Sequence, residues 1–126
     1  MSQNSNETVQ VYTYHGMVGE VIPKHVTHVT VHPWVIQILS KAFFECRKLE
    51  SIKLHKGVTI IGSQAFLSCE KLTYINLHES SVEVIDRHAF CHCTSLKRVE
   101  FPPSLKTINK YAFFYCESLT IIDLSV

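Results

Sequence analysis

The stretch CRKLESIKLHKGVTIIGSQAF, residues 46–66, contains one full copy of the pattern that decides the fold of this 126-residue chain. A second, closely matching copy, CTSLKRVEFPPSLKTINKYAF, occupies residues 93–113. The Ala-Phe pair that ends each copy occurs four times, at spacings of 23, 24 and 23 residues. Repetition at a fixed period of roughly 20 to 50 residues is typical of proteins built from stacked, similar units.

Four sets of residues keep the same place in every unit. The cysteines are Cys46, Cys69, Cys93 and Cys116, and the leucines that follow them are Leu49, Leu72, Leu96 and Leu119. Apolar residues stand three and five positions after each leucine: Ile52 and Leu54, Ile75 and Leu77, Val99 and Phe101, Ile122 and Leu124. A second apolar pair precedes each Ala-Phe: Val35 and Ile38, Val58 and Ile61, Val82 and Ile85, Leu105 and Ile108. An earlier strand is predicted in the same register, at Val26, Val29 and Val31.

The alternation after each leucine predicts a short strand with one buried face and one solvated face. Such widely spaced strands cannot form hairpins, so we expect parallel strands joined by right-handed crossovers. Because one unit cannot bury its own apolar residues, the units must stack into a curved solenoid. We predict an α/β fold with a short parallel β-sheet on the concave face and short second strands, 3-10 turns or helical turns on the convex side. The extra residue of the 24-residue unit falls in the polar loop 77–82, where an insertion costs little.

The second apolar pair and the Ala-Phe turn should form the crossover, with the four phenylalanines in the interior. Directly after the second pair we expect left-handed turn conformations at Gly62, Asp86 and Asn109, since these residue types tolerate them. Leu39 occupies this position in the first unit and predicts a different turn there.

These residues resemble the BspA-type leucine-rich repeat, whose unit reads approximately Cys-x-x-Leu-x-x-Ile-x-Leu-Pro-x-x-Val-x-x-Ile-Gly-x-x-Ala-Phe-x-x. The resemblance covers roughly residues 26–126 and implies a leucine-rich-repeat horseshoe. It also implies binding functions: adhesion, surface display and the recognition of other proteins. Only Pro102 occupies the proline position of the family pattern.

The segments around the repeats differ from them. Residues 1–10 are polar and predict a disordered N-terminus, whereas residues 11–25 are apolar enough to predict an N-terminal cap. Residues 26–126 form the expected leucine-rich-repeat domain. The sequence stops just after the last strand, so we expect an uncapped C-terminal edge that is prone to pair with another chain.

Charge and composition exclude several classes of partner. Twelve basic residues against 11 acidic ones give a net charge of +1 without a basic run, so we expect no nucleic-acid partner. No stretch reaches the ~18 uninterrupted apolar residues of a membrane span, and the first residues lack the pattern of an export signal. These features predict no membrane span and favour an intracellular location.

The five cysteines are explained by packing. Four of them recur at one position and predict a ladder of small buried hydrophobes rather than disulfides. Cys91 occupies a slot held by large apolar residues in other units, so we expect it in the core. The run Cys91-His92-Cys93 resembles a metal cluster only in isolation, because packing explains both cysteines. The pair His88 and His92 could share a metal ion, but no third ligand is evident.

Outward-facing residues on successive strands should form three columns. The first reads His28, Ser51, Tyr74, Arg98 and Ile121, the second reads Thr30, Lys53, Asn76, Glu100 and Asp123, and the third reads His32, His55, His78, Pro102 and Ser125. We interpret the first four members of the first column, the whole second column and the three histidines as the candidate binding surface. Tyr74 and Arg98 lie mid-face and belong to types common at binding hot spots. The change of sign from Lys53 to Glu100 and Asp123 favours a polar partner with complementary charge.

Two further features leave alternatives open. The aligned histidines are either ordinary solvated residues, a three-nitrogen site for zinc or another transition metal, or a surface sensitive to mild acid. Trp34, in a loop after Pro33, either forms an exposed contact surface or packs against the cap.

The sequence has no phosphate-binding loop, nucleophile elbow or metal-binding helix motif, so we expect no enzyme, no catalytic residue and no cofactor. We predict a non-enzymatic interaction module that binds a protein or peptide through the concave sheet face. One alternative is a structural repeat protein that forms homo-oligomers through its C-terminal edge. The other is a metal-binding protein that uses the histidine column.

Overall fold

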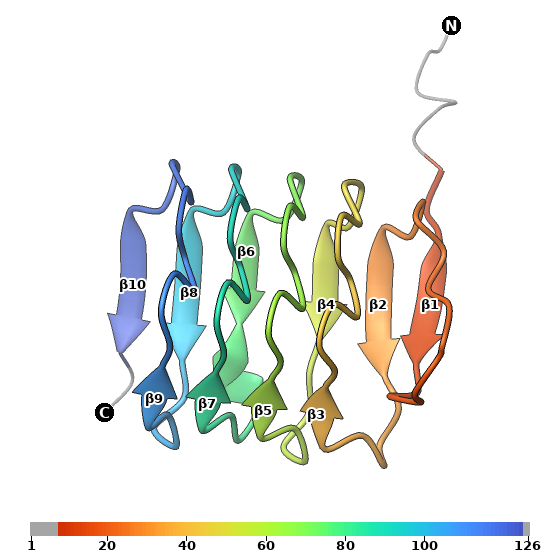
Figure 1. Cartoon of the computed structure of the whole chain (residues 1–126), viewed down its shortest axis with the longest axis horizontal. Coiled ribbons are helices and arrows are strands. Elements are labelled where there is room, and N and C mark those ends of the chain that lie inside the picture. Colours follow the sequence, from red (N-terminus) through yellow and green to blue (C-terminus); the bar gives the residue numbers. More distant parts are fainter. Residues whose placement is uncertain (1–7, 125–126) are drawn as a thin grey trace, which may run out of the picture.

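A computed structural model describes residues 8–124 of the chain. The chain winds into a β-solenoid whose coils lie side by side, with β1 (Val11–Tyr14) at one end of the stack and β10 (Ile121–Leu124) at the other (Figure 1). One layer contains the longer strands and the other contains strands of two residues. Every strand pairing is parallel, so the predicted stack of parallel strands is confirmed.

The first layer consists of β1 (Val11–Tyr14), β2 (His28–Val31), β4 (Ser51–Lys53), β6 (Tyr74–Asn76), β8 (Arg98–Phe101) and β10 (Ile121–Leu124). The second layer consists of β3 (Gln37–Ile38), β5 (Ile60–Ile61), β7 (Val84–Ile85) and β9 (Thr107–Ile108). A short 3-10 helix, η2 (Leu77–Glu79), follows β6 directly, in the loop predicted to hold the extra residue. Residues 8–124 contain no α-helix, so the helical part of the expected α/β class is not seen there. No helix in this part of the chain is long and apolar enough to cross a membrane.

The second layer is one continuous sheet, but the first layer is split. Its strands form two sheets, in the orders β1-β2-β4 and β6-β8-β10, so β4 and β6 are not paired. Within each sheet the predicted columns lie in register. The paired residues include His28 and Ser51, Thr30 and Lys53, Tyr74 and Arg98, Asn76 and Glu100, and Glu100 and Asp123.

The phenylalanines of the Ala-Phe turns form a stack of rings through the centre of the solenoid. Successive rings of Phe43, Phe66, Phe90 and Phe113 have centroids 5.1 to 5.3 Å apart and lie within 9° of parallel. The first three are fully buried. Tyr14 extends the stack at its N-terminal end, with its ring 5.2 Å from that of Phe43. The predicted interior position of these rings is confirmed.

The cysteines form the predicted packed ladder. Cys46, Cys69 and Cys93 are fully buried, Cys91 is 3% exposed, and all five cysteines are free thiols. The thiols of Cys69, Cys93 and Cys116 each donate a hydrogen bond of 3.0 to 3.3 Å to a phenylalanine carbonyl of the preceding coil. Burial raises the pKa of the Cys69 and Cys93 thiols, so these side chains stay protonated. The ladder therefore links the coils by hydrogen bonds as well as by packing.

The predicted positions of the left-handed turns are wrong by two residues. The expected residues do not have a positive φ: Gly62, Asp86 and Asn109. Positive φ occurs instead on either side of each Ala-Phe turn, at Lys41 and Glu45, Gln64 and Ser68, His88 and His92, and Tyr111 and Tyr115. There the backbone N–H points to the next coil, as in the 2.9 Å bond from Gln64 to the Arg87 carbonyl. Gly62 meets a different need, because a Cβ there would lie 2.7 Å from the Ile38 carbonyl oxygen.

The segment expected to cap the repeats begins with β1, which pairs with β2 and extends the first layer. The Tyr14 hydroxyl accepts a 2.9 Å hydrogen bond from the N–H of Leu39. In later coils the equivalent N–H donates to a carbonyl of the preceding coil: Gly62 to Ile38, Asp86 to Ile61, and Asn109 to Ile85. The first turn therefore differs in this hydrogen bond, where a side-chain hydroxyl replaces the missing carbonyl. The predicted difference in backbone conformation is not seen, because positive φ occurs at Lys41 as it does at Gln64 and His88. Disorder was predicted for residues 1–10, of which residues 1–7 lie outside the described residues.

Candidate functional site: the outward face of the longer strands

The outward side chains of β2, β4, β6, β8 and β10, here called the strand face, include most of the predicted binding residues. Their neighbours in sequence point into the core, because side chains alternate along a strand. The exposed members are Thr30, Ser51, Lys53, Tyr74 and Arg98, and the half-buried members are His28, Asn76 and Glu100. Asp123 holds the expected register position on β10. The first two predicted columns therefore share one face.

Tyr74, Arg98 and Glu100 form a polar cluster across β6 and β8. The Tyr74 hydroxyl donates to Glu100 Oε2 at 2.7 Å, and the Arg98 guanidinium pairs with the same oxygen at 3.0 Å. The guanidinium carbon lies 5.6 Å from the centre of the Tyr74 ring. Desolvation raises the pKa of Tyr74, and the hydrogen bond to Glu100 raises it further. The three groups hold one another in place while 40% of Tyr74 stays exposed for contact.

The break between β4 and β6 coincides with a depression in the strand face. Its volume is about 410 Å³, and its lining residues are Ser51, Ile52, Lys53, Leu54, Tyr74, Asn76 and Glu79. The apolar residues Ile52 and Leu54 lie at its floor, and both are nearly buried. Exposed side chains of opposite charge, Lys53 and Glu79, lie among its other lining residues. An apolar floor with a few polar groups is the usual composition of a pocket for a ligand side chain.

The predicted histidine column does not assemble into a three-nitrogen site. His55 Nδ1 accepts a 3.0 Å hydrogen bond from the N–H of Gly57, and its Nε2 lies 3.0 Å from the His32 carbonyl oxygen. Both ring nitrogens are thus engaged, with the proton assigned to Nε2. His78 lies in η2, beyond the end of β6. Among residues 8–124, no group of three His, Cys, Asp or Glu residues is arranged to hold a metal ion.

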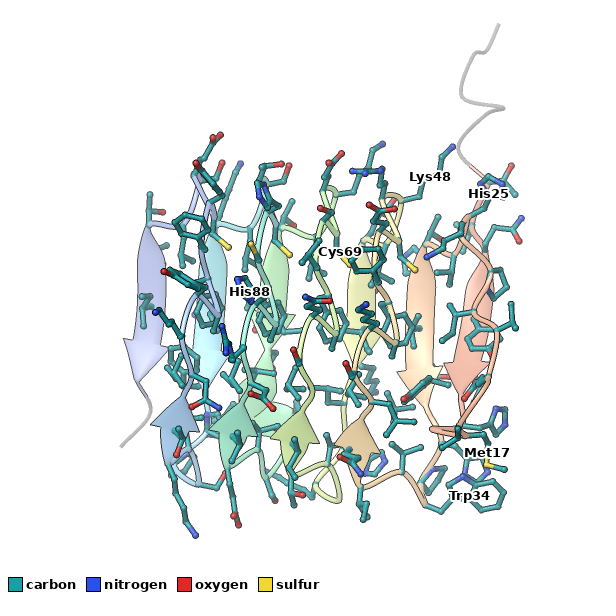
Figure 2. The ribbon with its side chains drawn as sticks, viewed as in Figure 1. Met17, His25, Trp34, Lys48, Cys69 and His88 are labelled. Atoms are coloured by element: carbon teal, nitrogen blue, oxygen red, sulfur yellow. The ribbon has the colours of Figure 1, made fainter. Side chains whose placement is uncertain are left out.

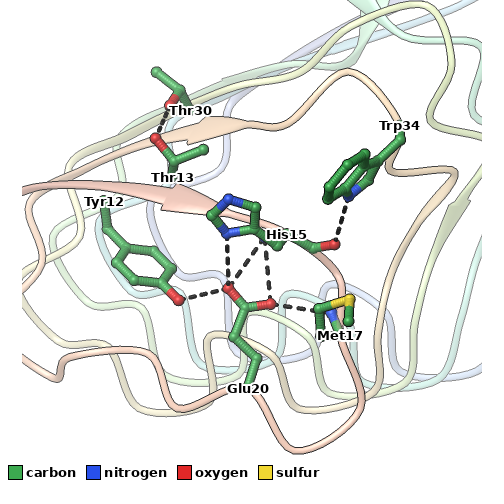
Figure 3. Close-up of polar contacts among 7 residues, drawn as sticks. All are labelled: Tyr12, Thr13, His15, Met17, Glu20, Thr30 and Trp34. Carbon is green, nitrogen blue, oxygen red and sulfur yellow. Dashed lines mark hydrogen bonds and ion pairs between the residues drawn. The ribbon is translucent and has the colours of Figure 1, made fainter.

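The cap is organised around the carboxylate of Glu20, as Figure 3 shows. It accepts hydrogen bonds from the Tyr12 hydroxyl and from the backbone N–H groups of His15 and Met17. Burial alone raises the pKa of Glu20, but these hydrogen bonds outweigh it and lower the pKa below its ordinary value. Burial and the neighbouring carboxylate raise the pKa of Tyr12 to about 12. The carboxylate therefore fixes the loop that follows β1.

Trp34 is both exposed and in contact with the cap. It is 64% exposed, yet its indole N–H donates a 3.2 Å hydrogen bond to the His15 carbonyl of the cap (Figure 3). Its ring centroid lies 3.9 Å from that of His32, and the His15 ring lies 5.3 Å from His32. The indole is therefore an exposed side chain held against the N-terminal end of the solenoid.

Comparison with known proteins identifies the repeat. The model of the BspA type leucine rich repeat region matches residues 23–126 in six copies. The chain belongs to the BspA-type leucine-rich repeat family. Proteins of this repeat class generally serve as scaffolds for interaction with other proteins. No curated protein matches the chain significantly.

Two solved structures support this assignment. A leucine-rich repeat protein from Bacteroides ovatus ATCC 8483 is 35% identical with a TM-score of 0.72, over 77% of this chain and 24% of that one. A leucine-rich repeat protein from T. pallidum is 31% identical with a TM-score of 0.74, over 92% of this chain and 52% of that one. The chain thus spans about a quarter and about half of the lengths of these two leucine-rich repeat proteins.

The sequence did not lead us to predict two features of the strand face. It placed Tyr74, Arg98 and Glu100 in columns, but it did not predict that Glu100 joins the other two. The register contained that signal, because Glu100 lies opposite Asn76, two residues from Tyr74. It also missed the break beside β6, although the longer repeat unit begins its extra loop directly after that strand.

Proposed function

We propose that the chain is a non-enzymatic module that binds a protein, through an extended peptide segment, across the strand face. In the horseshoe that the family implies, this face would be the concave side. The observation that best supports this proposal is the Tyr74–Arg98–Glu100 cluster beside the depression between β4 and β6. Tyrosine and arginine are enriched at protein-binding hot spots, and here both are already held in place before a partner arrives.

The depression supplies the second part of the proposal. One apolar side chain of the peptide occupies the space above Ile52 and Leu54, and the Tyr74 ring forms one wall. Lys53 and Glu79 contact polar groups that flank this side chain in the peptide. Because the two charges have opposite signs, they also favour one orientation of the bound segment.

The test is a selection of peptides from a displayed random library on the immobilised chain, followed by measurement of the dissociation constant by calorimetry. The critical variant carries Tyr74→Ala and Arg98→Ala. A matched control carries Tyr111→Ala and Arg87→Ala, which remove the same side-chain types from exposed positions off the strand face. We expect the first variant to weaken binding by about 100-fold, as is typical for loss of a hot spot of 2 kcal/mol or more, and the control to bind like the wild type.

Thermal unfolding of both variants separates binding from folding. Tyr74 and Arg98 are surface residues, so we expect nearly unchanged unfolding temperatures. Equal loss of binding in both variants, or full binding by the Tyr74→Ala and Arg98→Ala variant, refutes the proposed face.

A further inference from the structure

A cavity of about 440 Å³ lies at the amino ends of β1, β2 and β4. Its lining residues are Thr8, Val9, Gln10, His25, Thr27, Lys48, Glu50 and Lys71. Figure 2 shows His25 and Lys48 at this end of the strands, on the N-terminal side of the stack. The depression of the strand face has a different position and a different lining.

The basic residues of this cavity come from one column of the repeat. His25, Lys48 and Lys71 each stand one residue before the buried residue that precedes the strand, in three consecutive coils. The next two coils have Ser95 and Ser118 at this position. The three basic side chains lie in one row across consecutive coils, and all three line the same cavity. Positive charge in this column is therefore confined to the coils that line the cavity.

These cationic groups are not neutralised by neighbours. Within residues 8–124, the Lys48 and Lys71 amines make no ion pair or hydrogen bond, whereas the adjacent Arg47 is paired with Glu70. Glu50 is the one acidic side chain in the described lining, and it makes no ion pair there either. Two ammonium groups and an imidazole against one carboxylate leave the cavity with a positive potential.

We propose that this cavity binds a phosphate or sulfate group through Lys48, Lys71 and His25. Such an oxyanion has several acceptor oxygens and suits donors that converge from neighbouring coils. The volume exceeds the space of a single ion, so the rest of a small ligand, such as a sugar that carries the anion, fits beside it. Glu50 opposes the negative charge and limits the affinity. This site is independent of the proposed peptide binding.

The test is a titration followed by NMR, with glucose 6-phosphate, glucose 6-sulfate, inorganic phosphate, inorganic sulfate and glucose as probes. We expect saturable shifts at the amides around the cavity with the charged probes and none with glucose. The compound with the lower dissociation constant identifies which of the two anions the site prefers.

Variants make the test specific. Lys48→Ala with Lys71→Ala should weaken binding of the preferred anion by about tenfold or more, and Glu50→Gln should strengthen it by about threefold. Lys106→Ala with Lys110→Ala removes the same net charge outside the cavity and should leave binding unchanged. The proposal is overturned if neither anion binds saturably, or if the control weakens binding as much as the cavity variant. Neither result bears on peptide capture by Tyr74 and Arg98.

Discussion

Replacement of Tyr14 by phenylalanine isolates a single hydrogen bond on which the N-terminal end of the solenoid depends. The hydroxyl of Tyr14 accepts a 2.9 Å bond from the Leu39 N–H, and the side chain is 1% exposed. Tyr14→Phe keeps the ring against Phe43 but removes the acceptor. The Leu39 N–H of the first turn then has no acceptor. In each later coil the equivalent N–H donates to a carbonyl of the preceding coil.

The expected cost follows from that geometry. Leaving a buried backbone donor unsatisfied costs about 1 to 3 kcal/mol, and the retained ring adds no large cavity term. With a urea m-value of about 2 kcal/mol/M, a loss of about 2 kcal/mol lowers the unfolding midpoint by about 1 M.

Urea unfolding followed by circular dichroism measures this shift. Tyr111→Phe is the matched control, because Tyr111 is 43% exposed and its hydroxyl makes no hydrogen bond within residues 8–124. We expect the control to change the free energy of unfolding by less than about 0.5 kcal/mol. A Tyr14→Phe effect no larger than that of the control refutes the role assigned to this hydroxyl.

Three further predictions concern the cap, the cysteines and the ring stack. Because folding lowers the pKa of Glu20, its ionised form stabilises the fold above the unfolded-state pKa of about 4.3, and this contribution is lost as the pH falls through the lower folded-state pKa. Urea unfolding should therefore show that the difference in free energy of unfolding between wild type and Glu20→Gln becomes smaller below about pH 5. An increase of this difference in acid would count against the reasoning. A thiol reagent at about pH 8 should modify Cys69 and Cys93 only after unfolding, because burial raises their pKa and blocks access; rapid labelling of the native chain contradicts this. Phe66→Ala should cost about 3 to 5 kcal/mol by calorimetry and clearly more than Phe114→Ala, since Phe114 is 45% exposed; equal costs would disprove the ring stack as a main source of stability.

Periodicity predicted the parts of this fold that depend on burial. The phenylalanine stack, the cysteine ladder and the strand registers repeat because each coil buries the same positions against its neighbours. The positions of positive φ were predicted wrongly because the prediction relied on residue type. Lys41 and Gln64 adopt positive φ although neither is a usual left-handed residue, since the conformation directs their N–H groups to carbonyls of the next coil.

The candidate site was predicted as a set of columns but not as a set of contacts. Alternation placed Tyr74 and Arg98 on the strand face, whereas their joint contact with Glu100 depends on side-chain conformations that a pattern does not specify. For the same reason the alignment of the histidines could not show whether their ring nitrogens are free to bind a metal ion. His55 has the right position for a metal ligand, but the Gly57 N–H of the turn that follows it engages Nδ1 and the His32 carbonyl of the preceding coil engages Nε2.

The central claim, that the strand face between β4 and β8 is the binding surface, is tested most directly by NMR mapping with a selected peptide. The account predicts that the largest amide shifts fall on β4, β6, η2 and β8, and that β5, β7 and β9 on the opposite layer stay unchanged. Saturable binding with the largest shifts on the opposite layer would contradict it.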